Sequence, residues 1–206
     1  MDDQNDDINC NLNHKTELYT DGGYEMTREV YLLTGNPDKL KSAEKAFEGK
    51  SVELKQLDED YPEIQASSSL EVARHTVEQA VEEYDKPVIR EDHSVYLDAV
   101  PGFPGPYMSY FDKNVPAERL LEILEGEEHT GYFEIGAVLG FPNGEIKEYE
   151  FRVPIEISEE IRGDERNWDR VMMLEGENET FAEASGESRL GIWNRNLRKI
   201  AEKLSK

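Results

Sequence analysis

The sequence predicts a mixed α/β fold in which helices flank a sheet. In the first hundred residues, short apolar runs typical of strands alternate with segments that have the apolar spacing of helices. Two longer runs, 131–141 and 145–153, then flank Pro142-Asn143-Gly144 and predict an antiparallel hairpin. Together the two patterns indicate a mixed sheet. The length of 206 residues favours one domain.

The first ordered element is predicted to be a buried strand at 30–33, which runs into the turn Thr34-Gly35-Asn36-Pro37. A helix follows from Asp38, because its apolar residues have helical spacing, and it ends at Gly49. A second strand is expected at 52–57, where the residues alternate like those of a strand.

The middle of the chain is predicted to contain a second helix and two short strands. Three serines at 67–69 look like a helix cap, and the apolar stripe from Val72 to Val81 indicates one buried helix face. Residues 87–89 and 95–97 are each expected to form a short strand, with two acidic residues ending the first.

The rest of the chain is expected to hold two more helices around the hairpin. Residues 101–107 are rich in proline and glycine, so they are predicted to be too bent for the interior of a helix or strand. A helix is expected at 116–124, and a loop with Trp168 and Asp169 follows the hairpin. A final helix has its apolar side at Leu197, Ile200, Ala201 and Leu204.

The charge of the chain limits its partners. The 46 acidic and 23 basic side chains give a formal charge of −23. Binding to nucleic acid or to anionic membranes depends on Lys and Arg near phosphates, so neither partner is expected. No apolar run approaches the roughly 18 residues of a membrane span, which argues against an integral membrane protein. The acidity either serves solubility or, as our hypothesis, adapts the protein to a salt-rich cytoplasm.

Residues 1–27 are polar and lack periodicity, so they are predicted to be a disordered acidic tail, and residues 28–206 to form the single domain. The tail contains Cys10 and His14, and two ligands on such a segment rarely make a metal site. Cys10 is the one cysteine of the chain and cannot form an internal disulfide, which fits a reducing cytoplasm.

The turn Thr34-Gly35-Asn36 is the first candidate site. At the start of a helix it can offer backbone N–H groups and the positive end of the helix dipole to an anion. Lys39, in the first turn, can place its ammonium over the same spot. A strand–turn–helix with one lysine is also common in proteins that bind nothing there, so this pattern alone leaves both interpretations open.

Carboxylates at the ends of predicted strands form the second candidate site. Glu63 follows Asp60-Tyr61-Pro62, and Glu91 and Asp92 follow an apolar strand. Ligands of open α/β sheets bind beyond the carboxyl ends of the strands, and Mg²⁺ prefers oxygen ligands. The alternative is that these are solvated acids of a very acidic protein.

The third candidate combines Trp168 and Asp169 with Arg189 and Arg195 further on. An indole can stack on a nucleobase, a carboxylate can accept from a ring N–H, and arginines can pair with phosphate or carbonyl groups. A core tryptophan with surface arginines is the alternative interpretation.

In combination, these segments resemble the inosine triphosphate pyrophosphatase family, which removes noncanonical purine nucleoside triphosphates. Six motifs of the family occur here in the same order. The T-G-N-x-x-K opening matches Thr34–Lys39, the P-E-x-Q loop matches Pro62–Gln65, and the acidic pair matches Glu91-Asp92. The G-x-P-G-x-Y turn matches Gly102–Tyr107, the aromatic–Asp pair matches Trp168-Asp169, and the T-F-A-E segment matches Thr180–Glu183. The resemblance covers residues 29–204.

The resemblance implies a two-lobed mixed sheet with a central cleft, usually in a homodimer, and Mg²⁺-dependent hydrolysis to a nucleoside monophosphate and pyrophosphate. Carried over residue by residue, it implies that Lys39, with Thr34 and Asn36, holds the triphosphate. Glu63 and Asp92 would bind the metal and position the attacking water, with Glu91 in support.

The sequence departs from the family mainly on the side of the base. Arg166 stands at the position of a stacking phenylalanine, and Trp193 and Asn194 replace a serine and a histidine of a late motif that otherwise aligns with Arg189 and Arg195. We therefore expect the reaction to be retained and the base selectivity to differ. A paralogue for another nucleotide and a nucleotide-binding protein without turnover are the alternatives.

Overall fold

The computed structural model describes residues 29–164, 167–184 and 191–205. The predicted tail, 1–27, lies outside the described residues, as do Arg166 and Arg189. None of the described helices has the length and hydropathy needed to cross a bilayer.

Seven strands form one sheet in the order β2-β1-β3-β5-β6-β7, and β4 pairs with β3 beside this path. β1 is parallel to β2 and β3, whereas the other pairs are antiparallel, which confirms the predicted mixed sheet. The strands are β1 (Glu29–Leu33), β2 (Glu53–Leu57), β3 (Val88–Leu97), β4 (Val100–Gly105), β5 (Thr130–Gly140), β6 (Ile146–Ile157) and β7 (Met172–Leu174).

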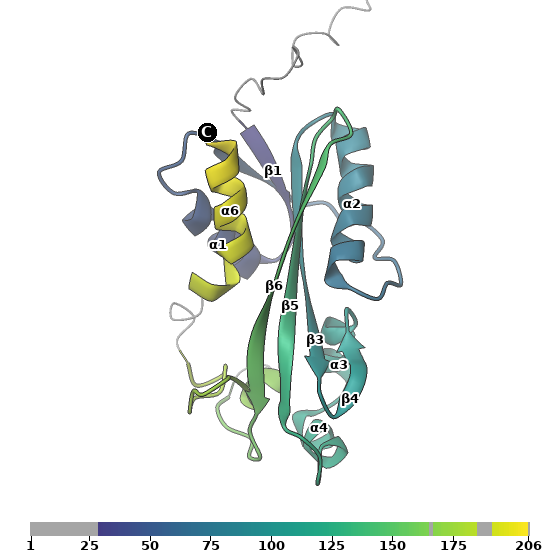
Figure 1. Ribbon diagram of the computed structural model, residues 1–206, viewed down its shortest axis with the longest axis vertical. Coiled ribbons are helices and arrows are strands. Elements are labelled where there is room, and N and C mark those ends of the chain that lie inside the picture. Colours follow the sequence, from purple (N-terminus) through teal and green to yellow (C-terminus); the bar gives the residue numbers. More distant parts are fainter. Residues whose placement is uncertain (1–28, 165–166, 185–190, 206) are drawn as a thin grey trace, which may run out of the picture.

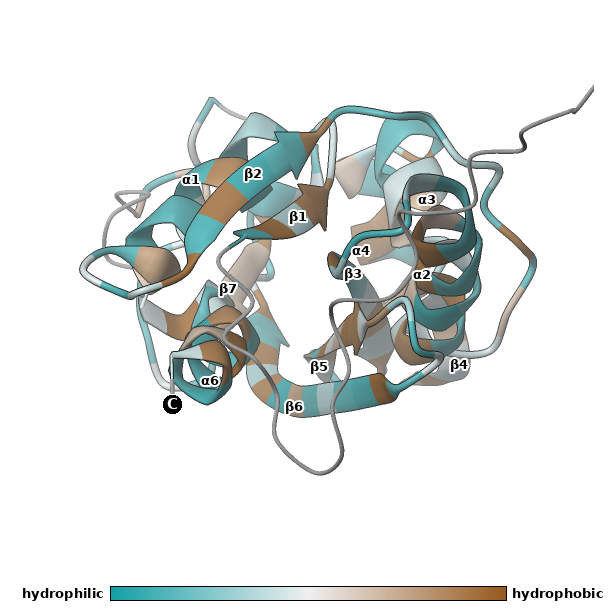
Figure 2. Ribbon diagram, turned by 90° about the horizontal axis from the view of Figure 1, so that it is seen from above, coloured by the Kyte–Doolittle hydropathy of each residue, from teal (hydrophilic) through white to brown (hydrophobic). Residues whose placement is uncertain are grey.

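The helices cover both faces of the curled sheet. α1 and α6 pack side by side on one face and α2 packs on the other (Figures 1 and 2). The helical segments are α1 (Pro37–Phe47), α2 (Ser69–Tyr84), α3 (Met108–Asn114), α4 (Ala117–Ile123), the short 3₁₀ helix η1 (Trp168–Arg170) and α6 (Arg195–Leu204).

The long strands β3, β5 and β6 connect two lobes (Figure 1). In the upper lobe, two apolar clusters fill the spaces between the sheet and α1 with α6, and between the sheet and α2. In the lower lobe, a third cluster lies among the far ends of the same strands, α4 and η1, and includes Trp168. The predicted two-lobed fold is thus confirmed, and each lobe has its own core.

Gly136 in the centre of β5 lets α2 approach the sheet. A Cβ atom there would lie 2.9 Å from the backbone nitrogen of Leu70 and 3.1 Å from its Cα, both in the first turn of α2. That turn is held in place by Ser69, whose hydroxyl donates to the Glu134 carbonyl and lies 2.6 Å from the Ser94 hydroxyl. A larger residue at 136 must therefore displace the start of the helix.

We predict that Gly136→Ala lowers the free energy of unfolding by about 2 kcal/mol, because backbone rather than a movable side chain blocks the added methyl. Urea unfolding measures the change. Gly191→Ala is the matched control, since a Cβ at that position has no atom within 4 Å. Equal unfolding midpoints for the two variants would contradict this packing.

Three local predictions need correction. Residues 88–97 form one continuous strand, because every residue from Val88 to Leu97 pairs with β5, so the acidic pair lies within a strand and not at its end. Residues 100–105 form β4, whose prolines are tolerated because this strand pairs only with β3 and its register shifts there. The short helix α3 at 108–114 was not predicted; only Met108 and Phe111 pack against the lower core, and none of its residues is fully buried.

Candidate active site

A cleft of about 970 Å³ lies between the two lobes. Its upper part comes from the turn after β1, the loop after β2, and β3, and its lower part from α3, β5, η1 and β7. The lining residues are Thr34, Gly35, Asn36, Lys39, Asp58, Glu59, Asp60, Tyr61, Pro62, Glu63, Arg90, Asp92, His93, Met108, Ser109, Asp112, Lys113, Phe133, Asp169 and Met172. The structure therefore brings Lys39, Glu63 and Asp92 to one cleft.

Lys39 extends from the first turn of α1 across the end of β1 to β3. Its Nζ donates to the Glu91 carbonyl at 2.8 Å and lies 3.9 Å from Oδ1 of Asp92. The side chains of Lys39 and Asp92 are 21% and 16% exposed, so water screens this pair only in part. A cation and an anion thus stand side by side at the cleft wall.

The turn at the start of α1 differs from the expectation in one respect. Oδ1 of Asn36 accepts from the backbone N–H groups of Asp38 and Lys39, at 2.8 and 3.4 Å, and the Asn36 N–H itself donates to Thr34 Oγ1. These N–H groups are therefore occupied by the helix cap and are not offered to an anion. The charge of Lys39 remains as the main attraction for an anion there.

Glu63 is held at the cleft by an arginine that was not predicted. Nη2 of Arg90 lies 3.2 Å from Oε1 of Glu63, while Nη1 donates to the Leu33 carbonyl. The preceding Tyr61 hydroxyl donates to Glu83 of α2, and burial together with this carboxylate raises the pKa of Tyr61 well above its usual value. The loop is thus tied to the sheet and to a helix. The signal in the sequence that could have identified Arg90 as a cleft residue is its position directly before the acidic pair.

Glu91 and Asp92 point to opposite faces of β3, because successive residues of a strand alternate, and His93, on the same face as Glu91, also lines the cleft. Asp92 lines the cleft, whereas the Glu91 carboxylate is 2% exposed and is not among the lining groups. Oε2 of Glu91 lies 3.2 Å from Nε2 of His93, and Oε1 has no hydrogen-bond partner. Glu91 therefore reaches the cleft only through His93.

Trp168 does not have the expected position. Its side chain has no exposed surface, and its indole N–H donates to the Val115 carbonyl at 2.7 Å. The expectation that Trp168 stacks on a base is thus corrected, because the ring belongs to the lower core, near Phe103. The neighbouring Asp169 does line the cleft.

Arg195, the late predicted residue that the structure describes, does not line the cleft. The Arg195 guanidinium lies over the ring of Phe151, 5.3 Å from its centroid, and Arg195 is not among the cleft residues. Asn194 is buried with an unpaired Oδ1, and Trp193 packs against His93 and Phe133. Arg189 and Arg166 lie outside the described residues.

The matched segment 180–183 has a structural role. The Thr180 N–H and hydroxyl both donate to Oε2 of Glu183, at 2.9 and 3.1 Å. The backbone hydrogen bond from Thr180 is the main reason why the pKa of Glu183 is lowered. Arg162 pairs with the same carboxylate at 3.6 Å, so the segment closes a turn beside β7.

The cleft suits a cation that binds together with its substrate. Within the described residues, no group of three or more His, Cys, Asp or Glu side chains is arranged to hold a metal ion by itself. Mg²⁺, however, is usually held by one or two carboxylates, several waters and the substrate phosphates. The carboxylates of Asp58, Asp60, Glu63 and Asp92 around this cleft provide that donor chemistry.

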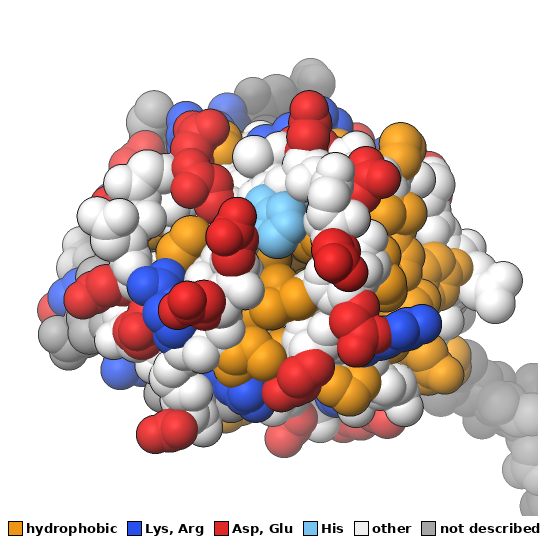
Figure 3. Space-filling view, turned by 90° about the horizontal axis from the view of Figure 1, so that it is seen from below, with side chains coloured by type: hydrophobic (Ala, Val, Ile, Leu, Met, Phe, Trp, Pro, Cys, Tyr) orange, Lys and Arg blue, Asp and Glu red, His pale blue; other side chains and the backbone are white. Residues whose placement is uncertain are grey.

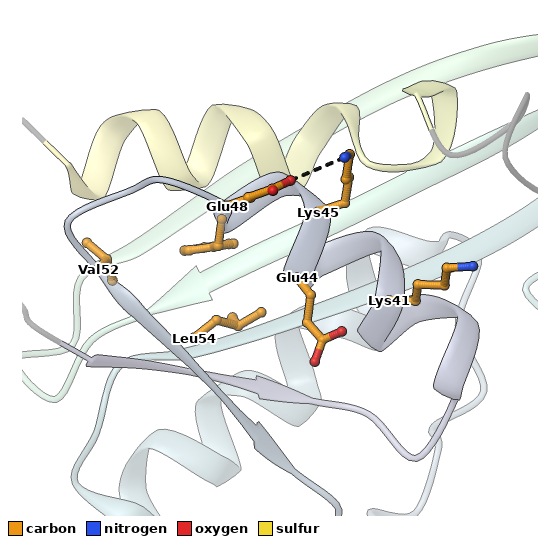
Figure 4. A pocket seen from close by; sticks show the side chains of 7 residues that line it. Lys41, Glu44, Lys45, Glu48, Val52 and Leu54 are labelled. Carbon is orange, nitrogen blue, oxygen red and sulfur yellow. Dashed lines mark ion pairs between the residues drawn. The ribbon is translucent and has the colours of Figure 1, made fainter.

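A second hollow, of about 490 Å³, lies between α1 and β2 (Figure 4). Val52, Leu54 and Phe47 line its base, and Lys45 and Glu48 at its rim form an ion pair of 3.2 Å. Its two lysines, Lys41 and Lys45, stand beside two glutamates, Glu44 and Glu48, and its walls are largely apolar, so the hollow suits a polyphosphate less well than the cleft.

Comparison with known families matches residues 30–202 to the model of the Ham1 family. The chain belongs to the Ham1 family. A dITP/XTP pyrophosphatase from Methanopyrus kandleri is 35% identical over 179 residues, which cover 84% of this chain and 95% of that protein. A protein of the same name from Ignicoccus hospitalis is also 35% identical, over 87% of this chain and 98% of its own length.

Solved structures of Ham1 proteins have the same fold. The one from Coxiella burnetii superposes with a TM-score of 0.73 at 21% identity and covers 85% of this chain and 98% of its own. The one from Staphylococcus aureus gives a TM-score of 0.70 at 22% identity, with 85% and 97% covered. The predicted resemblance to this group of nucleotide enzymes is therefore confirmed for family and fold.

Proposed function

We propose that this Ham1 protein is a Mg²⁺-dependent pyrophosphatase that hydrolyses noncanonical purine nucleoside triphosphates to nucleoside monophosphates and pyrophosphate. The observation that carries the proposal is the position of Lys39, Glu63 and Asp92 on one cleft. The names of the two archaeal relatives, dITP/XTP pyrophosphatase, support the substrate class.

The polar part of the cleft fits the triphosphate. Lys39 would bind phosphate oxygens, and Thr34, Gly35 and Asn36 line the adjoining wall. Asp92 and Glu63 would hold Mg²⁺, which when bound neutralises phosphate charge. One of these two carboxylates would also orient the attacking water and accept its proton. Glu91 would support the site indirectly, since its carboxylate contacts His93.

The lower part of the cleft fits the nucleoside. Met108, Phe133 and Met172 add apolar surface there, and Asp169 adds a carboxylate that can accept from a purine N–H. Arg189 and Arg195 stay candidates for substrate binding from the sequence, although Arg195 packs on Phe151 in this structure.

A pyrophosphate-release screen tests the function. We expect release from dITP, ITP and XTP with Mg²⁺, one pyrophosphate for each nucleoside monophosphate, and little release after chelation by EDTA. Including ATP and GTP measures how far the altered base-side residues change selectivity. Binding of nucleotides with no release of pyrophosphate would instead identify a binding protein.

We also propose a cytoplasmic protein adapted to high salt. Acidic side chains are spread over the face shown in Figure 3, in keeping with the net charge of −23. Because the screening length falls from about 8 Å in physiological salt to about 3 Å at 1 M, salt should relieve the repulsion. We predict a rise in melting temperature from dilute buffer to molar KCl, measured by calorimetry; an unchanged value would contradict the adaptation.

A homodimer is part of the proposal. Tyr107, Tyr110 and Ile123, in and beside α3 and α4, are exposed large apolar side chains that a partner copy would cover. The acidic surface disfavours nucleic acid and anionic membranes as partners.

A further inference from the structure

His93 is a cleft residue that the family motifs did not identify. It follows Asp92 on β3, and its side chain is 23% exposed at the cleft wall. It lies one residue beyond the proposed metal ligand, in the direction of the lower lobe. Phe133, which also lines the cleft, is on the same face two residues further along, because it pairs with Val95.

The imidazole of His93 is fixed from two sides. Its Nε2 lies 3.2 Å from Oε2 of Glu91, a carboxylate with almost no exposed surface. Its ring lies at 30° to the indole of Trp193, with the centroids 5.9 Å apart. A hydrogen bond and a neighbouring ring thus set both the position and the tilt of the imidazole.

Trp193 supports the second aromatic group of the cleft as well. The ring of Phe133 meets the indole edge-on, with the centroids 5.0 Å apart. The ring of Phe181, in the lower core, also contacts this indole, with the centroids 6.0 Å apart. Trp193 is therefore not a cleft residue itself but the common support of His93 and Phe133.

We propose that His93 and Phe133, supported by Trp193, form the surface on which this chain stacks the purine base. The inference rests on the proposed function. Lys39 and Asp92 place the phosphates at the upper end of the cleft, so the nucleoside extends towards His93, Phe133 and the lower lobe. Purines stack on flat rings whatever their ring substituents. Tyr61 lines the upper part of the cleft, and Trp168 is buried in the core, so His93 and Phe133 are the aromatic residues on the side of the lower lobe.

Two variants of His93 separate stacking from a merely structural contact with Glu91. His93→Phe keeps an aromatic face and loses the hydrogen bond to Glu91, whereas His93→Gln keeps a donor for Glu91 and loses the ring. Equilibrium binding of inosine monophosphate and of inorganic tripolyphosphate is measured by calorimetry, so no turnover is needed. A separate pyrophosphate assay of the unmodified protein tests the proposed function.

We expect His93→Gln to bind inosine monophosphate about 10-fold more weakly and His93→Phe to bind it within about 3-fold of the unmodified protein. Tripolyphosphate, which has no base, should bind equally to all three. Trp193→Leu should weaken binding of the monophosphate alone. The opposite order, with Gln normal and Phe impaired, would overturn the proposal, as would an equal loss of tripolyphosphate binding.

Discussion

Replacing Asp92 with asparagine is expected to slow pyrophosphate release by about 10³-fold, the size of effect seen for a lost acid–base group. The substitution removes one negative charge from the cleft wall beside Lys39, and it keeps the size of the side chain. The hydrogen-bonded strand around it should be unaffected. Initial rates at saturating nucleotide and Mg²⁺ measure the change.

Asp98→Asn is the matched control for this experiment. Asp98 directly follows β3 and is exposed, and it accepts a hydrogen bond from the Thr130 hydroxyl outside the cleft. We expect its turnover to remain within about 2-fold of the unmodified enzyme. Comparable losses in both variants, or a fully active Asp92→Asn protein, would contradict the role of Asp92.

Lys39→Met is expected to lower kcat/KM by about 100-fold, because a charged hydrogen-bond donor to phosphate contributes on the order of 2–3 kcal/mol. Most of this effect should be a higher KM for the nucleotide, and the inhibition constant of tripolyphosphate should rise as well. Steady-state kinetics give both values.

Lys45→Met provides the control on the same helix. Lys45 is exposed in the last turn of α1, where it pairs with Glu48 and lines the second hollow (Figure 4). Loss of this surface pair should change neither kcat/KM nor the inhibition constant. A tripolyphosphate constant that rises in Lys45→Met and stays normal in Lys39→Met would place the anion site elsewhere.

The sequence was sufficient for much of the fold because local signals determine it. Ser68, one of the three serines from which a helix cap was predicted, caps α2, and α1 begins at Pro37, one residue before its predicted start. The hairpin of β5 and β6 was predicted from two long runs on either side of the turn Pro142-Asn143-Gly144. By contrast, β3 was divided in two, because its polar stretch interrupts the apolar pattern although the backbone pairing with β5 continues.

For the site, the sequence predicted only those residues that belong to a recognisable motif within their own segment. The order of motifs indicated Lys39, Glu63 and Asp92. The ion pair of Arg90 with Glu63 and the contact of His93 with Trp193 join residues 27 and 100 positions apart, which no local pattern reveals. Trp168 was misplaced for the opposite reason, since the type of an aromatic residue does not show whether it faces a cleft or a core.

A crystal structure of the protein with Mg²⁺ and the α,β-methylene analogue of inosine triphosphate tests the central claim most directly. We expect the triphosphate chain in the cleft, with phosphate oxygens at hydrogen-bond distance from Lys39 Nζ and the metal ion on the carboxylates of Asp92 and Glu63. A nucleotide bound in the hollow between α1 and β2, or one in the cleft with its phosphates away from Lys39 and Asp92, would contradict it.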